Sequence, residues 1–444
     1  MKCAVITPVG PGHAELFAQV GGPSVEQARA YDTGPFSEIL HYVMDDTVGR
    51  HGRSARRNEA LQRALDEGVD WVFFLDADDK ITPNAFEAFG RVIAAEPELD
   101  AVWGLICTLD RGGEPELREG QAATIDSREE FLSVAPFNGV QIGGFYRTQV
   151  VARIGFDVGM NTGEDYKLYC QLWNTARCAK RPEIFFLNQR GLHSTGPRSA
   201  TGQDWNVSVS GQWVEQLSDA RVFVEVGGDS VAEPARMRLT NPADPSQAAH
   251  LRGEFFEQEA LGKLKALLGT TAPSIVDVGP GGGNHLVWCA RNLQPKRLIA
   301  VETDQATSDL LGENLTVNGL AETVQCRSLV AQAAVPALET AVFGTGLFAG
   351  PARSGEGGRG SLDSVLGDAP VDALRIDTVG TEIETLEGAA SVIARARPVL
   401  WVKVTPANAM RFLQGWCRGA NYRVIDSVFG AGVTDYFAVP KEAP

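Results

Sequence analysis

The sequence predicts a two-domain α/β protein, and three observations lead to this class. The chain has 444 residues, which is more than one hydrophobic core usually supports. Short apolar runs alternate with segments of helical periodicity, a pattern typical of a mostly parallel sheet covered by helices. A second alternation of this kind begins near Ser274 and is independent of the first. We therefore expect one domain over residues 1–218 and a second over 219–444, with a leading segment at 219–250.

The composition excludes several classes of protein. The hydrophobic fraction of 44% and the charged fraction of 22% are ordinary for a globular protein. The net charge of −16 argues against general binding to nucleic acid or to an anionic membrane. We find neither an apolar stretch of about 18 residues nor a signal peptide, so no transmembrane segment is predicted. The seven cysteines lack paired spacing, which favours reduced thiols and a cytoplasmic location.

The expected elements of the first half follow one another in the α/β order. Thr82 is the expected N-cap of the second helix, and Pro83 is its expected first residue. Strands are predicted over 3–8, 39–44, 71–75 and 101–108, and helices over 56–67 and 83–95.

The second half starts with a segment, 227–247, whose Gly, Pro, Asp and Ala content predicts a linker or a loosely structured entry into this half. Another Gly-rich stretch, 344–360, predicts a mobile loop or an insertion. Between them, helices are predicted over 254–268 and 285–292, and strands over 274–278 and 297–302.

Three carboxylates, Asp76, Asp78 and Asp79, follow the strand over 71–75 directly. In open α/β sheets, ligands bind outside the carboxyl ends of the strands. Clustered carboxylates repel one another, so they are usually placed to face a cation. Hard oxygen ligands indicate Mg²⁺ or Mn²⁺, with substrate phosphates completing the site. From these residues alone, an acidic turn at a strand end is an equal alternative.

Several short motifs follow one another along the first half. They are Ile6-Thr7-Pro8, Asp45-Asp46-Thr47, Arg57-Asn58-Glu59-Ala60, residues 74–79, residues 143–147 with 154–157, and residues 163–168. In this order, with a DXD-type metal motif at 74–79 and an ED motif at 163–168, residues 1–218 resemble the inverting GT-A glycosyltransferases of the family 2 class. The resemblance implies a Rossmann-like nucleotide-diphospho-sugar transferase domain that takes a UDP- or GDP-sugar as donor.

This resemblance implies roles for particular residues. Asp78 and Asp76 would hold Mn²⁺ or Mg²⁺, with His193 as a further ligand. Asp165 would be the catalytic base that accepts the proton of the acceptor hydroxyl, and Glu164 would orient the acceptor or the base. The residues implied in nucleotide-sugar binding are Pro8, Asp45, Asp46, Arg57 and Asp76.

Without the resemblance, simpler interpretations stay open. Glu164 and Asp165 also fit the acidic first turn of a solvated helix. Taken alone, His193 is more typical of a surface or capping histidine than of a metal ligand. Arg57 could bind diphosphate or only pair with an acid, and its charge alone does not decide.

A glycine-rich turn in the second half indicates a nucleotide-type cofactor. Gly279, Gly281 and Gly283 follow the strand over 274–278 and precede a helix, so the backbone there can approach a ligand closely. Glu302 ends the next strand, where an acid would hold ribose hydroxyls. This local pattern suits NAD and S-adenosyl-L-methionine equally.

Four segments of the second half form a wider pattern: 251–257, the glycine turn, 314–320 and 374–382. With them, residues 220–440 resemble the FkbM-type methyltransferases, which implies a Rossmann-like class I domain for O-methylation with S-adenosyl-L-methionine. The implied cofactor-binding residues are Asp277, Gly279, Gly281, Gly283, Asn284, His285 and Glu302, and those on the methyl-acceptor side are Asp377 and Glu382.

The second half also departs from the FkbM pattern. Val379 and Lys403 stand where that family usually carries acids, and the glycine turn has Pro280-Gly281-Gly282 where Ala-Asn-x is usual. Cofactor binding is compatible with these changes, whereas the acceptor chemistry depends on the missing acids.

The two resemblances together predict a bifunctional enzyme. It would transfer a sugar from a nucleotide-sugar donor to a glycan or glycoconjugate and methylate a glycan. In one alternative, the second domain is a non-catalytic binding module, which Val379 and Lys403 favour. In another, both domains are non-catalytic, against which the intact acid pairs argue.

Overall fold

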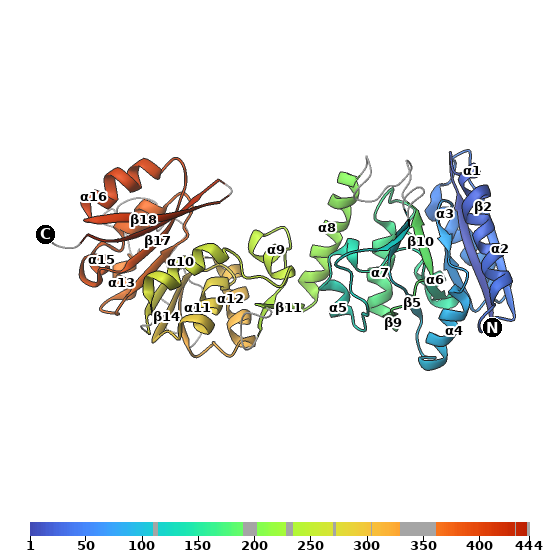
Figure 1. Ribbon diagram of the computed structural model, residues 1–444, viewed down its shortest axis with the longest axis horizontal. Helices are drawn as coiled ribbons and strands as arrows, with labels where there is room; N and C mark the ends of the chain where they lie inside the picture. Colours follow the sequence, from blue (N-terminus) through green and yellow to red (C-terminus); the bar gives the residue numbers. More distant parts are fainter. Residues whose placement is uncertain are drawn as a thin grey trace. The chain divides into compact units, whose positions relative to one another are not determined.

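The computed structural model describes residues 1–109, 114–189, 202–227, 234–269, 272–302, 304–328, 361–430 and 432–441. The chain divides into two compact units, Met1–Val222 and Phe223–Pro444 (Figure 1). Each unit has a central sheet with helices packed against it, so the predicted α/β class with two domains is confirmed. All seven cysteines are free thiols. Among the described residues, we find no helix whose length and apolar content would let it cross a membrane.

The first unit is built on a mostly parallel sheet with strand order β2-β1-β3-β8-β5-β9. Strand β8 alone among these runs antiparallel to its neighbours β3 and β5. The strands are β1 (Lys2–Val9), β2 (Glu38–Asp45), β3 (Trp71–Phe74), β5 (Ala101–Trp103), β8 (Phe145–Arg147) and β9 (Cys178–Lys180).

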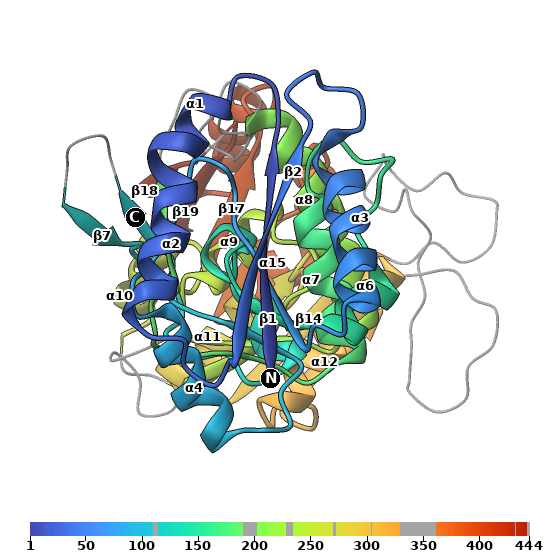
Figure 2. The same cartoon turned by 90° about the vertical axis from the view of Figure 1, so that its right-hand side faces the viewer.

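Helices cover both faces of this sheet. Figure 2 shows α2 and α4 on one side of β1 and β2, and α3 and α6 on the other. Phe86 and Phe89 of α4 pack with Val25 of α2 against Trp71 and Phe73 in one buried cluster. The helices are α1 (Ala14–Leu16), η1 (Phe17–Gly21), α2 (Gly22–Tyr31), α3 (Gly52–Asp66), α4 (Ala85–Ala95), α5 (Arg128–Leu132), η2 (Pro136–Asn138), α6 (Thr148–Ile154), α7 (Glu164–Thr175) and α8 (Gly202–Asp219).

The single strand predicted over 101–108 is wrong, because the chain changes sheets there. After β5 it leaves the main sheet at Gly104, where a Cβ atom would lie 2.3 Å from the carbonyl oxygen of Glu183. It then enters a smaller sheet with the order β4-β10-β6-β7. The strands of this sheet are β4 (Lys80–Ile81), β6 (Cys107–Leu109), β7 (Pro115–Leu117) and β10 (Phe186–Gln189).

The predicted start of the second helix is also wrong. Helix α4 begins at Ala85 with Asn84 as its N-cap residue. The Thr82 hydroxyl does not cap this helix but donates to the carbonyl oxygen of Ile184 at 2.8 Å. A contact with the neighbouring chain segment has therefore replaced the local capping interaction.

The second unit is built on a sheet with strand order β15-β14-β13-β16-β17-β19-β18. The strands from β15 to β17 are parallel, and β19 and β18 add an antiparallel hairpin at one edge. Buried side chains form one apolar cluster on each face of the sheet. The strands are β13 (Ser274–Val278), β14 (Arg297–Glu302), β15 (Val324–Ser328), β16 (Ala373–Ile376), β17 (Val399–Val404), β18 (Tyr422–Phe429) and β19 (Thr434–Pro440).

The segment predicted as a linker, 227–247, contains regular structure. Strand β12 (Ala235–Arg238) pairs antiparallel with β11 (Phe223–Val226), and α9 (Pro245–Leu251) follows. The Asp244 carboxylate caps α9 by accepting the Ser246 N–H at 2.9 Å. The composition indicated a linker because Pro and Asp are common in loops. Here, however, Asp244 and Pro245 start a helix.

The remaining helices of the second unit include one that starts later than predicted. The helix expected over 254–268 begins at Gln258, because Glu257 adopts a left-handed backbone with φ of 59°. The predicted loop at 344–360 lies outside the described residues. The helices are α10 (Gln258–Leu268), α11 (Asn284–Leu293), α12 (Gln305–Val317), α13 (Leu362–Leu366), α14 (Glu382–Glu387), α15 (Ala390–Ala396), η4 (Arg411–Trp416) and α16 (Cys417–Gly419).

Candidate functional site

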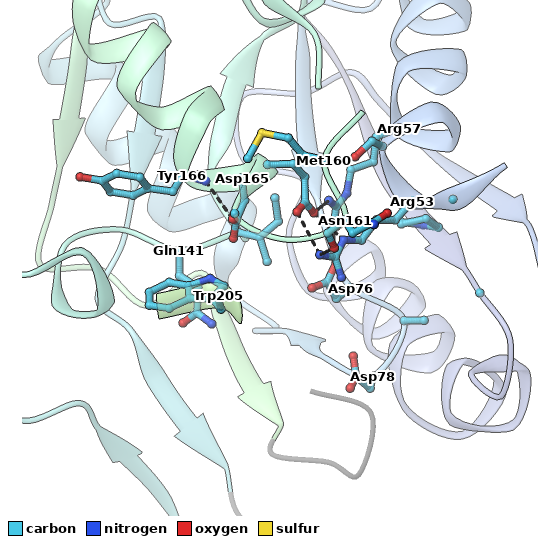
Figure 3. Close-up of a pocket in the computed structure, with 18 of the residues that line it drawn as sticks. Arg53, Arg57, Asp76, Asp78, Gln141, Met160, Asn161, Asp165, Tyr166 and Trp205 are labelled. Atoms are coloured by element: carbon cyan, nitrogen blue, oxygen red, sulfur yellow. Dashed lines mark hydrogen bonds and ion pairs between the residues drawn. The ribbon is translucent and has the colours of Figure 1, made fainter. Parts of the chain in front are cut away.

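A cavity of about 690 Å³ lies in the first unit, at the carboxyl ends of β1 and β3 and the amino ends of α3 and α7 (Figure 3). This is the edge of the sheet at which ligands bind in open α/β folds. Asp45 lies apart, at a smaller hollow of about 270 Å³. The predicted residues that line the large cavity are Pro8, Asp46, Arg57, Asp76, Asp78, Glu164 and Asp165.

Two arginines and two acids form an ion-pair network in this cavity. Glu164 is buried and accepts hydrogen bonds from Arg53, whose Nη2 lies 2.9 Å from Oε2. Arg57 lies 3.5 Å from the same carboxylate and donates to Asp76 at 2.5 Å. Glu164 therefore holds the two arginines in place. Arg53 was not predicted, although it precedes Arg57 by one helical turn and so shares its face of α3.

Asp165 differs from Glu164 because, within the ranges that the structure describes, no arginine forms an ion pair or hydrogen bond with its carboxylate. The Tyr166 backbone N–H donates to its Oδ1 at 2.8 Å. Burial, and then the neighbouring charge of Glu164, raise the pKa of Asp165 from 3.8 to about 6. Such a carboxylate is ionised at neutral pH but holds a proton more tightly than an ordinary aspartate. Those are the properties of a general base.

The three aspartates after β3 have different surroundings. Asp78 lines the cavity, and Asp76 lines it while paired with Arg57. Asp79 is buried and accepts the Gln189 backbone N–H at 2.8 Å, which ties the turn to β10. Burial, followed by the charges of Asp78 and Asp76, raises the pKa of Asp79 well above its usual range.

The donor set of the first unit fits a magnesium-type ion. Such an ion takes one or two carboxylates and obtains its other ligands from phosphates and water, and Asp78 and Asp76 offer two carboxylates at one cavity wall. Within the described ranges, no three or more His, Cys, Asp or Glu side chains form a group that could hold a metal by themselves. His193 lies outside the described residues.

The paired acids at the end of β2, Asp45 and Asp46, accept hydrogen bonds from backbone N–H groups. The Asp46 carboxylate accepts the N–H groups of Arg50 at 3.0 Å and Gly52 at 2.7 Å, at the start of α3. Burial would raise the pKa of Asp46, but these hydrogen bonds outweigh it and lower the pKa. Asp45 accepts the Thr47 N–H at 2.9 Å. Asp46 thus shapes the cavity by fixing the loop that leads into α3.

The glycine turn of the second unit has the shape of a cofactor cradle. A Cβ atom on Gly279 would lie 2.3 Å from the Asp377 carbonyl oxygen, and one on Gly283 would lie 2.7 Å from Leu311. Gly281 has a left-handed φ of 58° but faces open space. Close packing therefore requires two of the glycines, while the third leaves room for a ligand to approach the backbone. This arrangement fits a nucleotide-type cofactor, either NAD or S-adenosyl-L-methionine.

The other predicted cofactor residues lie around this turn. Glu302 ends β14 and accepts the Asp304 N–H at 3.1 Å. The Asn284 amide is bonded within the protein, to the His250 ring at 2.9 Å and to the backbone of Phe256 at 2.9 and 3.1 Å. Asn284 therefore ties the segment before α10 to the glycine turn.

A buried arginine connects three of the predicted residues of the second unit. Arg375 donates to Asp277 at 2.8 Å, to Asp377 at 2.6 Å and to the Gly279 carbonyl at 3.3 Å. The Coulombic attraction of Arg375 and Lys403 outweighs burial and lowers the pKa of Asp377. The guanidinium thus holds the ends of β13 and β16 together.

Glu257 was not predicted as a site residue, yet it joins the same network. It accepts Lys403 at 2.5 Å and His285 at 2.9 Å. Lys403 also lies 3.1 Å from Asp377. Burial would raise the pKa of Glu257, but hydrogen bonding to His285 and the nearby cations lower it to about 2. The lysine that departs from the FkbM pattern therefore neutralises two acids.

Glu382, expected on the methyl-acceptor side, is also engaged. Its carboxylate accepts both the backbone N–H and the hydroxyl of Thr405 at 2.8 Å. It is fully buried, whereas Val379 is exposed. Glu382 thus anchors the loop that follows β17.

Comparison with known proteins finds similarity among solved structures. No family model and no curated protein matches the chain. The structure of S. aureus TarS with UDP-GlcNAc matches with 15% identity and a TM-score of 0.37, over 50% of this chain and 68% of that one. The chain spans 40% of a longer TarS structure, at 14% identity and a TM-score of 0.36.

A second group of similar structures consists of methyltransferases. The ribosomal protein L11 methylase of Lactobacillus delbrueckii subsp. bulgaricus matches with 11% identity and a TM-score of 0.28, over 42% of this chain and 78% of that one. Streptococcus pneumoniae Sp1610, described as a tRNA (m1A22) methyltransferase and solved with S-adenosyl-L-methionine, matches with 16% identity and a TM-score of 0.29. It is matched over 42% of this chain and 74% of its own. These similarities concern the fold alone.

Proposed function

We propose that the chain is a bifunctional glycan-modifying transferase. The first unit would transfer a sugar, with inversion, from a UDP- or GDP-sugar to a glycan, with Mn²⁺ or Mg²⁺. The second would O-methylate a glycan with S-adenosyl-L-methionine. The observation that carries the first activity is one cavity that collects Asp78, Arg57 and the unusually basic Asp165.

The proposed sugar transfer follows from the charges around the cavity. The acceptor oxygen bonds to the anomeric carbon as the bond from that carbon to the diphosphate breaks, and the electron pair leaves with the diphosphate. Asp165 takes the acceptor proton from the side opposite the leaving group. Arg53 and Arg57 place positive charge beside the diphosphate. Asp78 and Asp76 would hold a divalent ion, which would further stabilise the charge of the leaving nucleoside diphosphate.

The metal assignment is tested with Asp78→Asn. The variant should fold normally and lose divalent-dependent binding of UDP- and GDP-sugars, because the amide no longer offers an anionic ligand. Calorimetry with and without Mn²⁺ measures this. Asp157→Asn is the matched control, since Asp157 pairs with Lys167 and lies outside the cavity lining. Normal donor binding by Asp78→Asn in Mn²⁺ would overturn the assignment.

The base is tested with Asp165→Asn. Donor affinity should be nearly unchanged, and transfer should fall by about 10²-fold or more, which is the usual contribution of a positioned base. The wild-type rate should rise with pH through about 6, the pKa of the Asp165 carboxyl. Equal transfer rates in the two proteins would assign the role to another group.

For the second unit, Glu302→Ala tests cofactor binding. Deleting a charged hydrogen-bond acceptor at the ribose should cost roughly 1.5–3 kcal/mol of binding free energy. Calorimetry with S-adenosyl-L-methionine and S-adenosylhomocysteine measures this loss. The absence of binding to the wild-type chain at millimolar concentration would refute the methyltransferase assignment.

A second candidate for this unit is a non-catalytic binding module. It is favoured by the ion pairs of Asp377 with Arg375 and Lys403, which lower the pKa of Asp377 and make it a weak base. In that case the unit would bind the cofactor or a glycan without turnover. Methylation of any offered glycan by the wild-type chain, lost in Glu302→Ala, would exclude this candidate.

A further inference from the structure

The large cavity of the first unit has two chemically different walls on either side of Asp165. Figure 3 shows Arg53, Arg57 and Asp76 on one side of Asp165, and Trp205 and Gln141 on the other. The first wall carries the charges that suit a diphosphate and its metal ion. The second is lined by an indole, an amide and apolar side chains: Pro136, Phe137, Val140, Gln141, Ile142 and Trp205.

Hydrogen bonds from two cationic side chains, and one cation–π contact, hold the backbone of the second wall. Arg118 donates to the Phe137 carbonyl at 2.5 Å, and its guanidinium lies 3.7 Å from the centre of the Phe137 ring. The buried Lys180 donates to the Gly139 carbonyl at 2.7 Å from behind. These two cations fix the backbone over 137–141, so the side chains on this wall are preorganised for a ligand.

Arg118 also fixes which end of the Gln141 amide is available. Its Nη2 lies 3.2 Å from Gln141 Oε1, and a guanidinium can only donate hydrogen bonds. The amide oxygen must therefore face Arg118, which leaves the NH₂ group as the end available to a ligand. Gln141 thus presents a hydrogen-bond donor to the cavity, which is suited to a hydroxyl oxygen.

Trp205 supplies an apolar face on the same wall. It extends from α8, is partly exposed and lines the cavity. Within the described ranges it takes part in no ring pair, unlike Trp103 and Trp173, which stack on each other. The negative face of an indole attracts the weakly positive C–H groups of a pyranose ring.

We propose that Trp205 and Gln141 form the acceptor subsite, which selects a neutral pyranoside. The sugar ring stacks on Trp205, one hydroxyl accepts from Gln141, and the reacting hydroxyl donates to Asp165. Among the described residues that line this wall none carries a carboxylate, and the cation Arg118 is engaged with the wall itself. This inference rests on the proposed sugar transfer and adds the class of acceptor and the residues that recognise it.

The test uses the full chain with Mn²⁺, a panel of UDP- and GDP-sugars, and methyl glycosides of neutral hexoses and of the matching uronic acids. Release of UDP or GDP above the rate of donor hydrolysis reports transfer. Trp205→Ala should raise the KM for the neutral glycoside about tenfold, the cost of losing an aromatic contact. Trp205→Phe should restore most of this affinity, and Val207→Ala, at an exposed position of α8, should change nothing.

Gln141→Glu is the sharper variant. It keeps the bond to Arg118 but replaces the donor by a carboxylate oxygen, so the KM should rise about tenfold. In all these variants the donor dissociation constant should stay at the wild-type value.

The outcomes separate this inference from the proposed function. A wild-type chain that binds no donor refutes the sugar transfer itself. If the donor binds, three results overturn the acceptor subsite alone: no neutral glycoside is accepted, only the uronides are accepted, or KM is unchanged in both Trp205→Ala and Gln141→Glu.

Discussion

The raised pKa of Asp165 implies a conflict between stability and the proposed catalysis. In the unfolded chain this carboxyl would titrate near 3.8, and in the folded protein it titrates near 6. The folded state therefore binds this proton more tightly than the unfolded state does. The stabilisation is fully present below about pH 3.8 and is lost as pH rises through about 6. At neutral pH, the ionised Asp165 should weaken the fold.

The size of this effect follows from the two pKa values. At about 1.4 kcal/mol for each pKa unit, the difference corresponds to about 3 kcal/mol at pH 7. Asp165→Asn cannot ionise, and its Oδ1 can still accept the Tyr166 N–H. We therefore expect the variant to be more stable than the wild type by up to about 3 kcal/mol at pH 7. That would raise the melting temperature of a unit of this size by about 6–12 °C.

Thermal melts of both proteins between pH 4 and pH 8 measure this difference. The difference in melting temperature between the two proteins should become small toward pH 4, where the wild-type Asp165 carboxyl is protonated. Asp157→Asn is a control of opposite sign, because its hydrogen bond with Lys167 lowers the pKa of Asp157 and favours the folded state above its ordinary pKa. Equal melting temperatures of wild type and Asp165→Asn at pH 7, or a gap that persists at pH 4, would refute the reasoning.

Two further predictions concern the second unit. Gly279→Ala should lower the melting temperature of the second unit strongly and abolish cofactor binding, because the new Cβ would lie 2.3 Å from the Asp377 carbonyl oxygen. Gly281 faces open space, so Gly281→Ala should cost only about 1–2 kcal/mol of stability for its left-handed backbone. Equal losses of the two variants in thermal melts would contradict this difference. Lys403→Met should cost roughly 1.5–3 kcal/mol, because Glu257 and Asp377 lose a charged donor and keep only Arg375 as a nearby guanidinium. Adding Glu257→Gln should recover part of this loss in urea denaturation, and no loss in the single variant would show that the ion pairs of Lys403 are unimportant.

Local sequence patterns correctly predicted those elements whose first and last residues are set by their neighbours in the sequence. Strands β13 and β14 match their predicted ranges because each is a buried apolar run between polar or turn-forming residues. The break at Gly104 was not predictable, since it depends on the approach of the Glu183 backbone. The start of α10 was missed because Glu257, whose sequence position suits a helix, adopts a left-handed backbone while paired with Lys403.

The same distinction applies to the candidate site. Asp76, Asp78 and Asp165 were found because acids at strand ends and helix starts form short motifs, and the cavity brings them together. Trp205 and Gln141 belong to no motif, and only the path of the chain places them on one wall. Their shared location carries no signal in the sequence.

The sequence by itself determined the α/β class, strands such as β13 and β14, and the positions of the acids along the chain, because these depend on residues close together in the chain. Only the tertiary structure decided which acids are paired. Glu164 meets Arg53 across 111 positions, and Glu257 meets Lys403 across 146. Whether a carboxylate is available as a base depends on its burial and on the charges within a few ångströms. Those neighbours come from distant segments that only folding brings together.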